Sequence, residues 1–148
     1  MSENNTRIES KLEIQCYLQN LRYALDNGAK LNIQIDRRVD QNRNIRYTNR
    51  FTLSDLFPDE DPSIALKQEL KQLTVENYIQ TVKDNRFEKK SEMREFGKYY
   101  CDKGDVYIKI RAELLADNGN HFVFVMSFHY AERPFTDATF PYRNNMEA

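Results

Sequence analysis

The segment Gly104–Tyr130 constrains the fold of this chain more than any other part. Its two halves, Asp105–Leu114 and His121–Tyr130, are rich in β-branched and aromatic residues, and their side chains alternate in character. Alternation with a period of two is typical of β-strands. The link between the halves contains Asn118-Gly119, a strong hairpin signal because both residues tolerate positive φ. The sequence therefore predicts an antiparallel hairpin.

Strand alternation sorts the side chains of this hairpin onto two faces. On the first strand, the apolar face comprises Val106, Ile108, Ile110 and Ala112. The polar face comprises Tyr107, Lys109, Arg111 and Glu113. On the second strand, the same rule separates Phe122, Phe124, Met126 and Phe128 from Val123, Val125, Ser127 and His129. We expect the apolar faces, including the four-residue Phe and Met set, to pack against helices.

Two helices are expected in the first half of the chain. The first spans about residues 6–28, with a capping box from Thr6 to Glu9 and a stop at Gly28. Its apolar face comprises Ile8, Leu12, Ile14, Tyr17, Leu18, Leu21 and Leu25. The second is capped by Asp61 with Pro62 at its first position, after a short helical turn that Pro58 ends. Its buried stripe comprises Ile64, Leu66, Leu70 and Leu73.

The remaining segments are less regular. For residues 30–51 we expect an inserted β-hairpin arm. Its first strand alternates through Leu31, Ile33 and Ile35, and residues 45–51 form the return strand. The alternative is a long ordered loop. Residues 74–90 fit either a helical turn or a strand that leads into a charged loop. Residues 92–100 are expected to form a further strand. The tail from 131 to 148 is expected to wrap around the domain in an extended conformation and to have a frayed end.

These elements indicate one domain over residues 1–148, of the α+β class, with N-terminal helices packed on a C-terminal antiparallel β-sheet. The formal net charge of -1 gives no overall basic field that would indicate nucleic acid. Cys16 and Cys101 are far apart and are expected to be unpaired thiols, as in a reducing cytoplasm of a bacterial host cell. No apolar run or signal-peptide pattern predicts a membrane partner.

The polar end of the hairpin is the strongest candidate site. We expect four catalytic candidates to converge there: Tyr107, Lys109, Arg111 and His129. Histidine can act as acid or base near neutral pH, cations can stabilise the charge of a phosphorane, and tyrosine can stack on a base. These groups suit the cleavage or binding of a phosphodiester without a metal or other cofactor. The alternative is a solvated sheet face held by cross-strand charge pairs, such as Lys109 with a nearby glutamate.

Other charged groups are candidates for binding. Five arginines of the arm could contact phosphates or an acidic protein surface: Arg37, Arg38, Arg43, Arg46 and Arg50. Arg94 or Lys98 could join the polar end, depending on the strand register. Four acidic residues between 55 and 61 could hold a cation, although helix capping and solubility explain them better. Phosphate-loop, dinucleotide and zinc motifs are absent from the sequence.

The order of motifs from about Leu70 onwards resembles a known family. "LKQLTVENY", "EMREFGK", "DVYIKI" and "VMSFHYAE" are similar to the MqsR toxins of the wider RelE-like mRNA interferase fold. The resemblance implies a small bacterial protein that cuts messenger RNA without metal and is neutralised by an antitoxin. It also implies a catalytic or RNA-contacting role for Tyr107, a polar strand residue at Arg94 or Glu95, and a basic residue at His129. Ile79 occupies the position where the family has a lysine, so Lys83 is the nearest substitute.

Three functions fit these observations. The first is an RNA-directed, toxin-type protein, either an endoribonuclease or an RNA-binding relative. The second is an inhibitor from a phage or other mobile element, of the anti-CRISPR type, that binds an RNA-guided nuclease or its guide RNA without being an enzyme. The third is a homodimeric scaffold that uses the Phe-rich strand as its interface. Whether the chain is an enzyme stays open at this point.

Overall fold

A computed structural model describes residues 4–35, 44–84, 92–100, 102–115 and 120–143. Three helices and six strands form an α+β fold: β1 Asn4–Arg7, α1 Lys11–Asp26, β2 Lys30–Ile33, α2 Asn49–Leu56, α3 Pro62–Lys71, β3 Tyr78–Asp84, β4 Met93–Tyr100, β5 Gly104–Leu115 and β6 Asn120–Tyr130. Short 3₁₀ turns occur at Ile45–Tyr47, Val75–Asn77 and Asp137–Thr139. None of the helices in this described part is long and apolar enough to cross a membrane.

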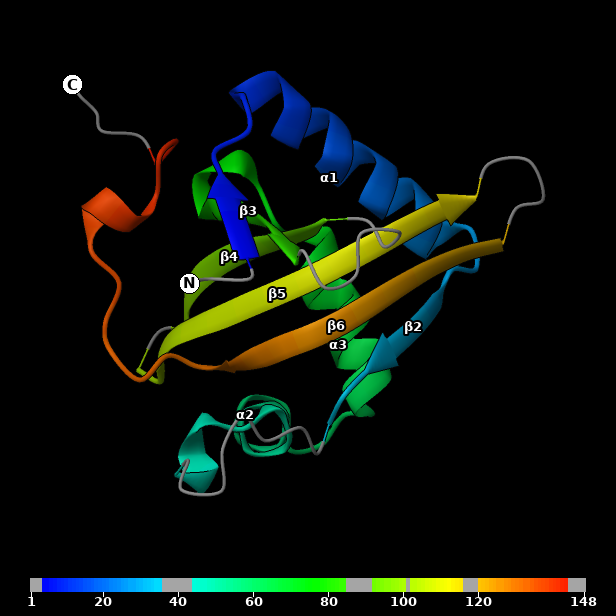
Figure 1. The fold of residues 1–148 in the computed structure, drawn as a ribbon. Coiled ribbons are helices and arrows are strands. Elements are labelled where there is room, and N and C mark those ends of the chain that lie inside the picture. Colours follow the sequence, from blue (N-terminus) through cyan, green and yellow to red (C-terminus); the bar gives the residue numbers. More distant parts are fainter. Residues whose placement is uncertain (1–3, 36–43, 85–91, 101, 116–119, 144–148) are drawn as a thin grey trace.

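The strands form one sheet in the order β1-β3-β4-β5-β6-β2. Every neighbouring pair is antiparallel except β2 with β6, which is parallel. Figure 1 looks onto the sheet with β5 and β6 in front and α3 behind them. Helices α1 and α3 therefore cover one face, called the helix face below, and the other is called the open face. Helix α2 lies along the edge of β6.

A layer of large side chains crosses the helix face in register. Tyr78 lies opposite Phe96, Phe96 opposite Ile108, and Ile108 opposite Phe128, on four successive strands. All four side chains are fully buried. The layer packs against leucines of the helices, including Leu21 of α1 and Leu66 and Leu70 of α3. This layer is the centre of the hydrophobic core.

The predicted hairpin is confirmed, but its second strand contains a β-bulge that the sequence analysis did not anticipate. Lys109 lies opposite Ser127, whereas the next residue, Ile110, lies opposite Val125, so Met126 is the extra residue. The bulge reverses the alternation within β6. Val123, Val125, Phe128 and Tyr130 are therefore buried, whereas Phe122 and Phe124 lie on the open face, opposite residues 113 and 111. The expectation that all the phenylalanines pack against the helices is wrong.

Helix α1 begins later than predicted. The capping box is formed by Ser10 and Glu13 rather than by Thr6 and Glu9, because residues 4–7 pair with β3 as the edge strand β1. Ile14, Leu18, Leu21 and Leu25 are buried as expected. Ile8 and Leu12 were expected in the same stripe, but they precede or begin the helix and are 53% and 67% exposed.

Helix α3 begins as predicted, since the Asp61 carboxylate accepts hydrogen bonds from the backbone N–H groups of Ser63 and Ile64 and Pro62 is the first helical residue. The residue Ile64, predicted in its buried stripe, is 61% exposed, and Ala65 is buried instead. The preceding helix α2 ends before Pro58 as expected.

Within the described residues, only the first strand of the predicted hairpin arm is found. Its first strand exists as β2, but β2 is a parallel edge strand of the main sheet, paired with residues 122–125 of β6. The return strand is wrong, because residues 45–47 form a 3₁₀ turn and residues 49–51 begin α2. The Asn49 side chain explains this choice: it donates to the carbonyls of Gln34 and Met126 and accepts from the Phe128 N–H, which ties α2 to β6.

The tail wraps around the sheet, as predicted. Its residues 131–143 are called the C-terminal strap below. The backbone N–H of Ala131 donates to the Asp105 carbonyl, and Phe140 is buried. At its far end the Tyr142 hydroxyl donates to the Glu9 carbonyl at 2.6 Å, and its ring stacks on Tyr78. The strap thus joins the end of β6 to the start of α1.

Replacing Phe96 by alanine should lower the free energy of unfolding by about 3–5 kcal/mol, because a large cavity would open in the middle of the four-strand layer. Urea unfolding followed by circular dichroism measures this change. Tyr99→Ala in the same strand is the matched control, since Tyr99 is 61% exposed and its loss should change stability by less than about 0.5 kcal/mol. Equal losses in both variants would contradict the assigned core.

Candidate functional site

Strand register brings the four catalytic candidates together on the open face of β5 and β6. Tyr107 lies directly opposite His129, and Lys109 and Arg111 follow at alternate positions of β5. Directly opposite residues of an antiparallel pair project to the same side of the sheet. The register therefore puts all four candidates on one face, with Tyr107 beside His129 and Arg111 four residues further along β5. Ser127, opposite Lys109, lies on the same face.

Tyr107 and His129 form the centre of this group. Their ring centroids are 5.5 Å apart and the ring planes are tilted by 45°. The His129 Nδ1 atom lies 2.9 Å from the Tyr130 carbonyl oxygen. Because a carbonyl oxygen only accepts, Nδ1 carries the proton and donates it. In the neutral ring Nε2 is then the basic nitrogen, as required of a general base.

Lys109 is held by a carboxylate. Its Nζ lies 3.9 Å from Glu95 Oε2 on β4, directly across the strand pair, and both side chains are largely buried. The Gln80 side-chain amide donates to the other Glu95 oxygen at 3.1 Å. The positive charge of Lys109 is thus balanced within the protein. Among the four candidates, Lys109 fits the alternative of a cross-strand charge pair.

Arg111 lies beside an aromatic ring of the open face. Its guanidinium is 5.5 Å from the centroid of the Phe124 ring, within the range of a cation–π interaction. Phe124 reaches this position because of the bulge at Met126. Arginine and aromatic side chains together can contact both the phosphates and the bases of a nucleic acid. Sequence alternation alone had assigned Phe124 to the core.

Arg94 and Lys98 do not join this group. Arg94 lies opposite Ile110 and Lys98 opposite Val106, so both project to the helix face. There Lys98 contacts Glu69 of α3 at 3.2 Å, and the Arg94 guanidinium lies 4.5 Å above the Tyr17 ring. The possibility that either residue faces Tyr107 is excluded by the register, which places Glu95 and Gly97 of β4 there instead.

Arg94 instead forms a buried ion pair with Glu9. Its Nε and second terminal nitrogen donate to the two Glu9 oxygens at 2.8 and 3.2 Å, and Thr81 donates to Oε2. Burial alone would raise the pKa of the Glu9 carboxyl, but the hydrogen bonds from Arg94 and Thr81 outweigh it, so this pKa lies below its usual value. Burial raises the pKa of the neighbouring Tyr78 hydroxyl, which accepts the Glu9 N–H.

Two of the five arginines of the predicted arm, Arg46 and Arg50, lie within the described residues. Arg37, Arg38 and Arg43 lie outside the described residues. Arg46 stacks over the Tyr130 ring at 4.6 Å and donates to the Lys103 carbonyl, and Arg50 is exposed at the start of α2. Lys83, the substitute for the family lysine, lies in β3, which β4 separates from β5.

Two of the four acidic residues between 55 and 61 have structural roles. Asp55 accepts a hydrogen bond from the Tyr130 hydroxyl at 2.6 Å, and burial together with this bond raises the pKa of Tyr130. Asp61 caps α3. Within the described ranges no group of three or more His, Cys, Asp or Glu side chains could hold a metal ion. His121, at the other end of β6, packs edge-on against Tyr23.

Comparisons with models of protein families, with curated proteins and with solved structures found no match for this chain.

Glu9→Gln should lower the free energy of unfolding by about 3–5 kcal/mol at neutral pH, because the Arg94 charge would stay buried without its carboxylate. The folded-state pKa of Glu9 is depressed. Its contribution is therefore present above the ordinary glutamate value of about 4.3 and is lost as the pH falls through the folded-state pKa. The stability difference between wild type and variant, measured by urea unfolding, should shrink in acid.

The matched control is Glu76→Gln, because Glu76 is exposed in a 3₁₀ turn. The free energy of unfolding of this variant should stay within about 0.5 kcal/mol of the wild-type value at every pH. A Glu9→Gln difference that stays constant from neutral to acidic solution would contradict the assigned role of the Glu9 carboxylate.

Proposed function

We propose that the open face at Tyr107 and His129 binds single-stranded RNA and cleaves it without a metal ion. The observation that carries this proposal is the direct pairing of a tyrosine ring with a histidine, 5.5 Å apart, with Arg111 on the same face. Unpaired bases stack on exposed aromatic rings of a sheet, and arginine contacts their phosphates. The resemblance to MqsR toxins is consistent with roles for these two residues and implies an antitoxin as a protein partner.

The proposed reaction needs only groups present on this face and water. His129 Nε2 takes the proton from a ribose 2′-hydroxyl, whose oxygen attacks the adjacent phosphorus. The bond from phosphorus to the 5′-oxygen breaks, and that oxygen takes a proton from water. The products are a 2′,3′-cyclic phosphate and a 5′-hydroxyl. Arg111, four residues further along β5, contacts a neighbouring phosphate of the strand, while Tyr107 holds a base by stacking.

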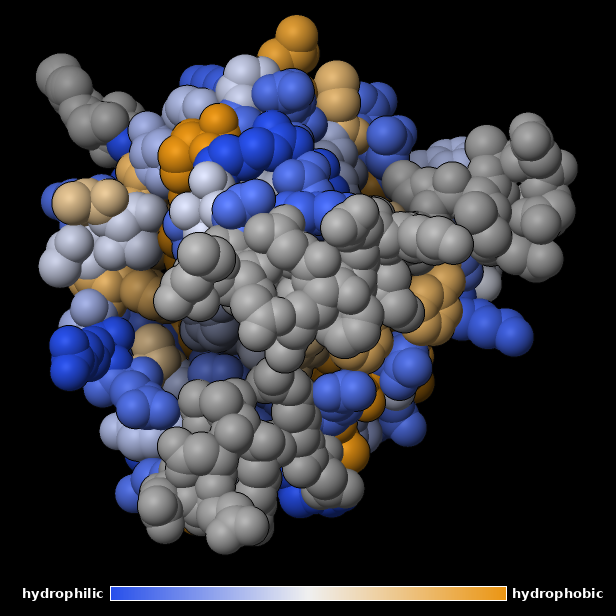
Figure 2. Space-filling view, viewed as in Figure 1, coloured by the Kyte–Doolittle hydropathy of each residue, from blue (hydrophilic) through white to orange (hydrophobic). Residues whose placement is uncertain are grey.

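Several features of the open face favour a nucleic acid over a bare solvated surface. Tyr107, Phe124 and His129 are only half-buried there, so their rings are accessible for stacking. Where Figure 2 draws this side in colour, hydrophobic residues are interspersed with hydrophilic ones. A strand of RNA presents the same mixture of apolar base faces and charged phosphates.

Replacing His129 by glutamine should lower the rate of RNA cleavage about 100-fold or more, because the general base is lost while a polar side chain remains. The assay uses an end-labelled single-stranded RNA in excess EDTA, with products separated on a denaturing gel and tested for the cyclic phosphate. The control is His121→Gln at the far end of β6. Cleavage at the wild-type rate by His129→Gln would show that this base is wrongly assigned.

Tyr107→Ala should weaken RNA binding by about 1–3 kcal/mol, the usual contribution of one aromatic stack. Fluorescence anisotropy with an RNA carrying 2′-O-methyl groups, which cannot be cleaved, measures binding separately from catalysis. Tyr23→Ala is the matched control, because Tyr23 is an exposed tyrosine of α1. A wild-type protein that neither binds nor cuts such RNA would refute the proposed function as a whole.

A further inference from the structure

The C-terminal strap borders the candidate site. The bridge from Ala131 N–H to the Asp105 carbonyl continues the β5–β6 ladder two residues beyond Tyr107 and His129. Four residues later, the Phe135 N–H donates to the Asp105 carboxylate at 2.8 Å. Both ends of the loop 131–135 are therefore attached to one residue, Asp105, in the strand that carries Tyr107.

Gly97 makes this attachment possible on the open face. It lies directly opposite Tyr107 in the β4–β5 pair. A Cβ atom at this position would lie 2.6 Å from a ring carbon of Phe135 and 3.0 Å from one of Phe140. The two rings pack edge to face, with centroids 5.4 Å apart. Only glycine leaves room for them, so the phenylalanines of the strap rest on the sheet beside Tyr107.

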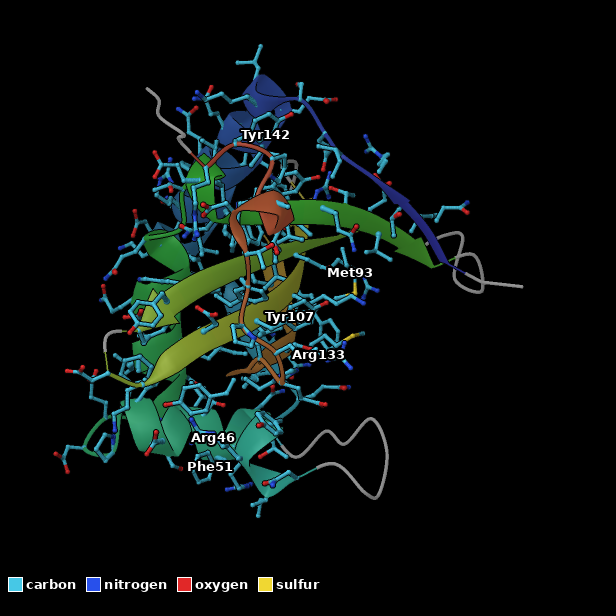
Figure 3. The ribbon with its side chains drawn as sticks, turned by 90° about the vertical axis from the view of Figure 1, so that its left-hand side faces the viewer. Arg46, Phe51, Met93, Tyr107, Arg133 and Tyr142 are labelled. Carbon is cyan, nitrogen blue, oxygen red and sulfur yellow. The ribbon has the colours of Figure 1, made fainter. Side chains whose placement is uncertain are left out.

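This loop carries an arginine that differs from Lys109, the lysine of the candidate site. Lys109 contacts the Glu95 carboxylate. Arg133 is exposed and makes no hydrogen bond or ion pair with any of the residues that the structure describes. In Figure 3 Arg133 and Tyr107 lie in the same part of the view, as expected from the attachment of the loop to Asp105. A cation that has no carboxylate partner among the described residues is a candidate to bind an external anion.

We propose that Arg133 binds a phosphate of the RNA strand held at Tyr107 and His129, and so positions that strand. This inference rests on the proposed function and extends it, since the site then includes a residue of the strap. Arg133 and Arg111 flank the Tyr107–His129 pair from its two ends along the strand direction. The strand would thus be held by a cation on either side of the stacked base.

The experiment measures the binding of the same 2′-O-methyl RNA by anisotropy at several salt concentrations. Arg133→Gln should weaken binding roughly five- to tenfold, as expected for one charge-assisted hydrogen bond at an exposed site. It should also reduce the slope of log affinity against log salt by about 0.7, the contribution of one phosphate contact on a single strand. Arg133→Lys should restore the salt slope. The matched control is Arg143→Gln, because Arg143 is a second arginine of the strap and lies 3.6 Å from Asp137.

A double-mutant comparison tests whether the strap acts through Arg133. Gly97→Ala should displace Phe135 and weaken RNA binding, while the thermal unfolding transition remains cooperative. The strap could affect RNA binding only through Arg133. In that case the double variant Gly97→Ala with Arg133→Gln should bind RNA no more weakly than Arg133→Gln alone.

The outcomes separate this inference from the function on which it rests. If the wild type binds RNA and Arg133→Gln binds as tightly as Arg143→Gln, the role of Arg133 is refuted and the proposed function stands. If Arg133→Gln or Gly97→Ala binds RNA more tightly than the wild type, the strap covers the site and the inference is likewise overturned. If the wild type does not bind RNA, both proposals fail together.

Discussion

The pairing of β5 with β6, which contains a bulge at Met126, decides which side chains enter the core and which lie on the open face. Without the extra residue, Phe128 and Tyr130 would project to the open face and Val123 and Val125 alone would remain in the core. The bulge lets one strand supply small apolar side chains to the core at one end and large aromatic ones at the other. It also places His129 opposite Tyr107 and Phe124 beside Arg111. Core packing and the candidate site thus follow from the same irregularity.

Three lysines and arginines that are largely buried in the sheet are each paired with a glutamate. A buried cation requires a partner, because an uncompensated charge in the interior costs several kcal/mol. Glu9, Glu69 and Glu95 supply that partner to Arg94, Lys98 and Lys109, respectively. This balance agrees with a net charge of -1 for a chain with 22 lysines and arginines. Arg133 of the strap differs from these three residues, because it is exposed and has no carboxylate partner among the described residues.

Glu9 joins parts of the chain that are distant in sequence. Its carboxylate binds Arg94 of β4 and Thr81 of β3, its N–H bonds the Tyr78 hydroxyl, and its carbonyl accepts from Tyr142 of the strap. The strap is therefore anchored at both ends, on Asp105 and on Glu9, and its middle rests on Gly97. An anchored segment loses little conformational freedom when it contacts a ligand, which favours a role in positioning.

Local periodicity and capping were enough to predict the α+β class, α3 with its Asp61 cap and the three long C-terminal strands. Tertiary structure alone decided the start of α1, the parallel placement of β2 and the faces of Phe124, Arg94 and Arg133. Each of these depends on which strand lies beside which and in what register. A bulge adds one residue without any distinctive local signal, and it changes the side of the sheet to which every following residue projects.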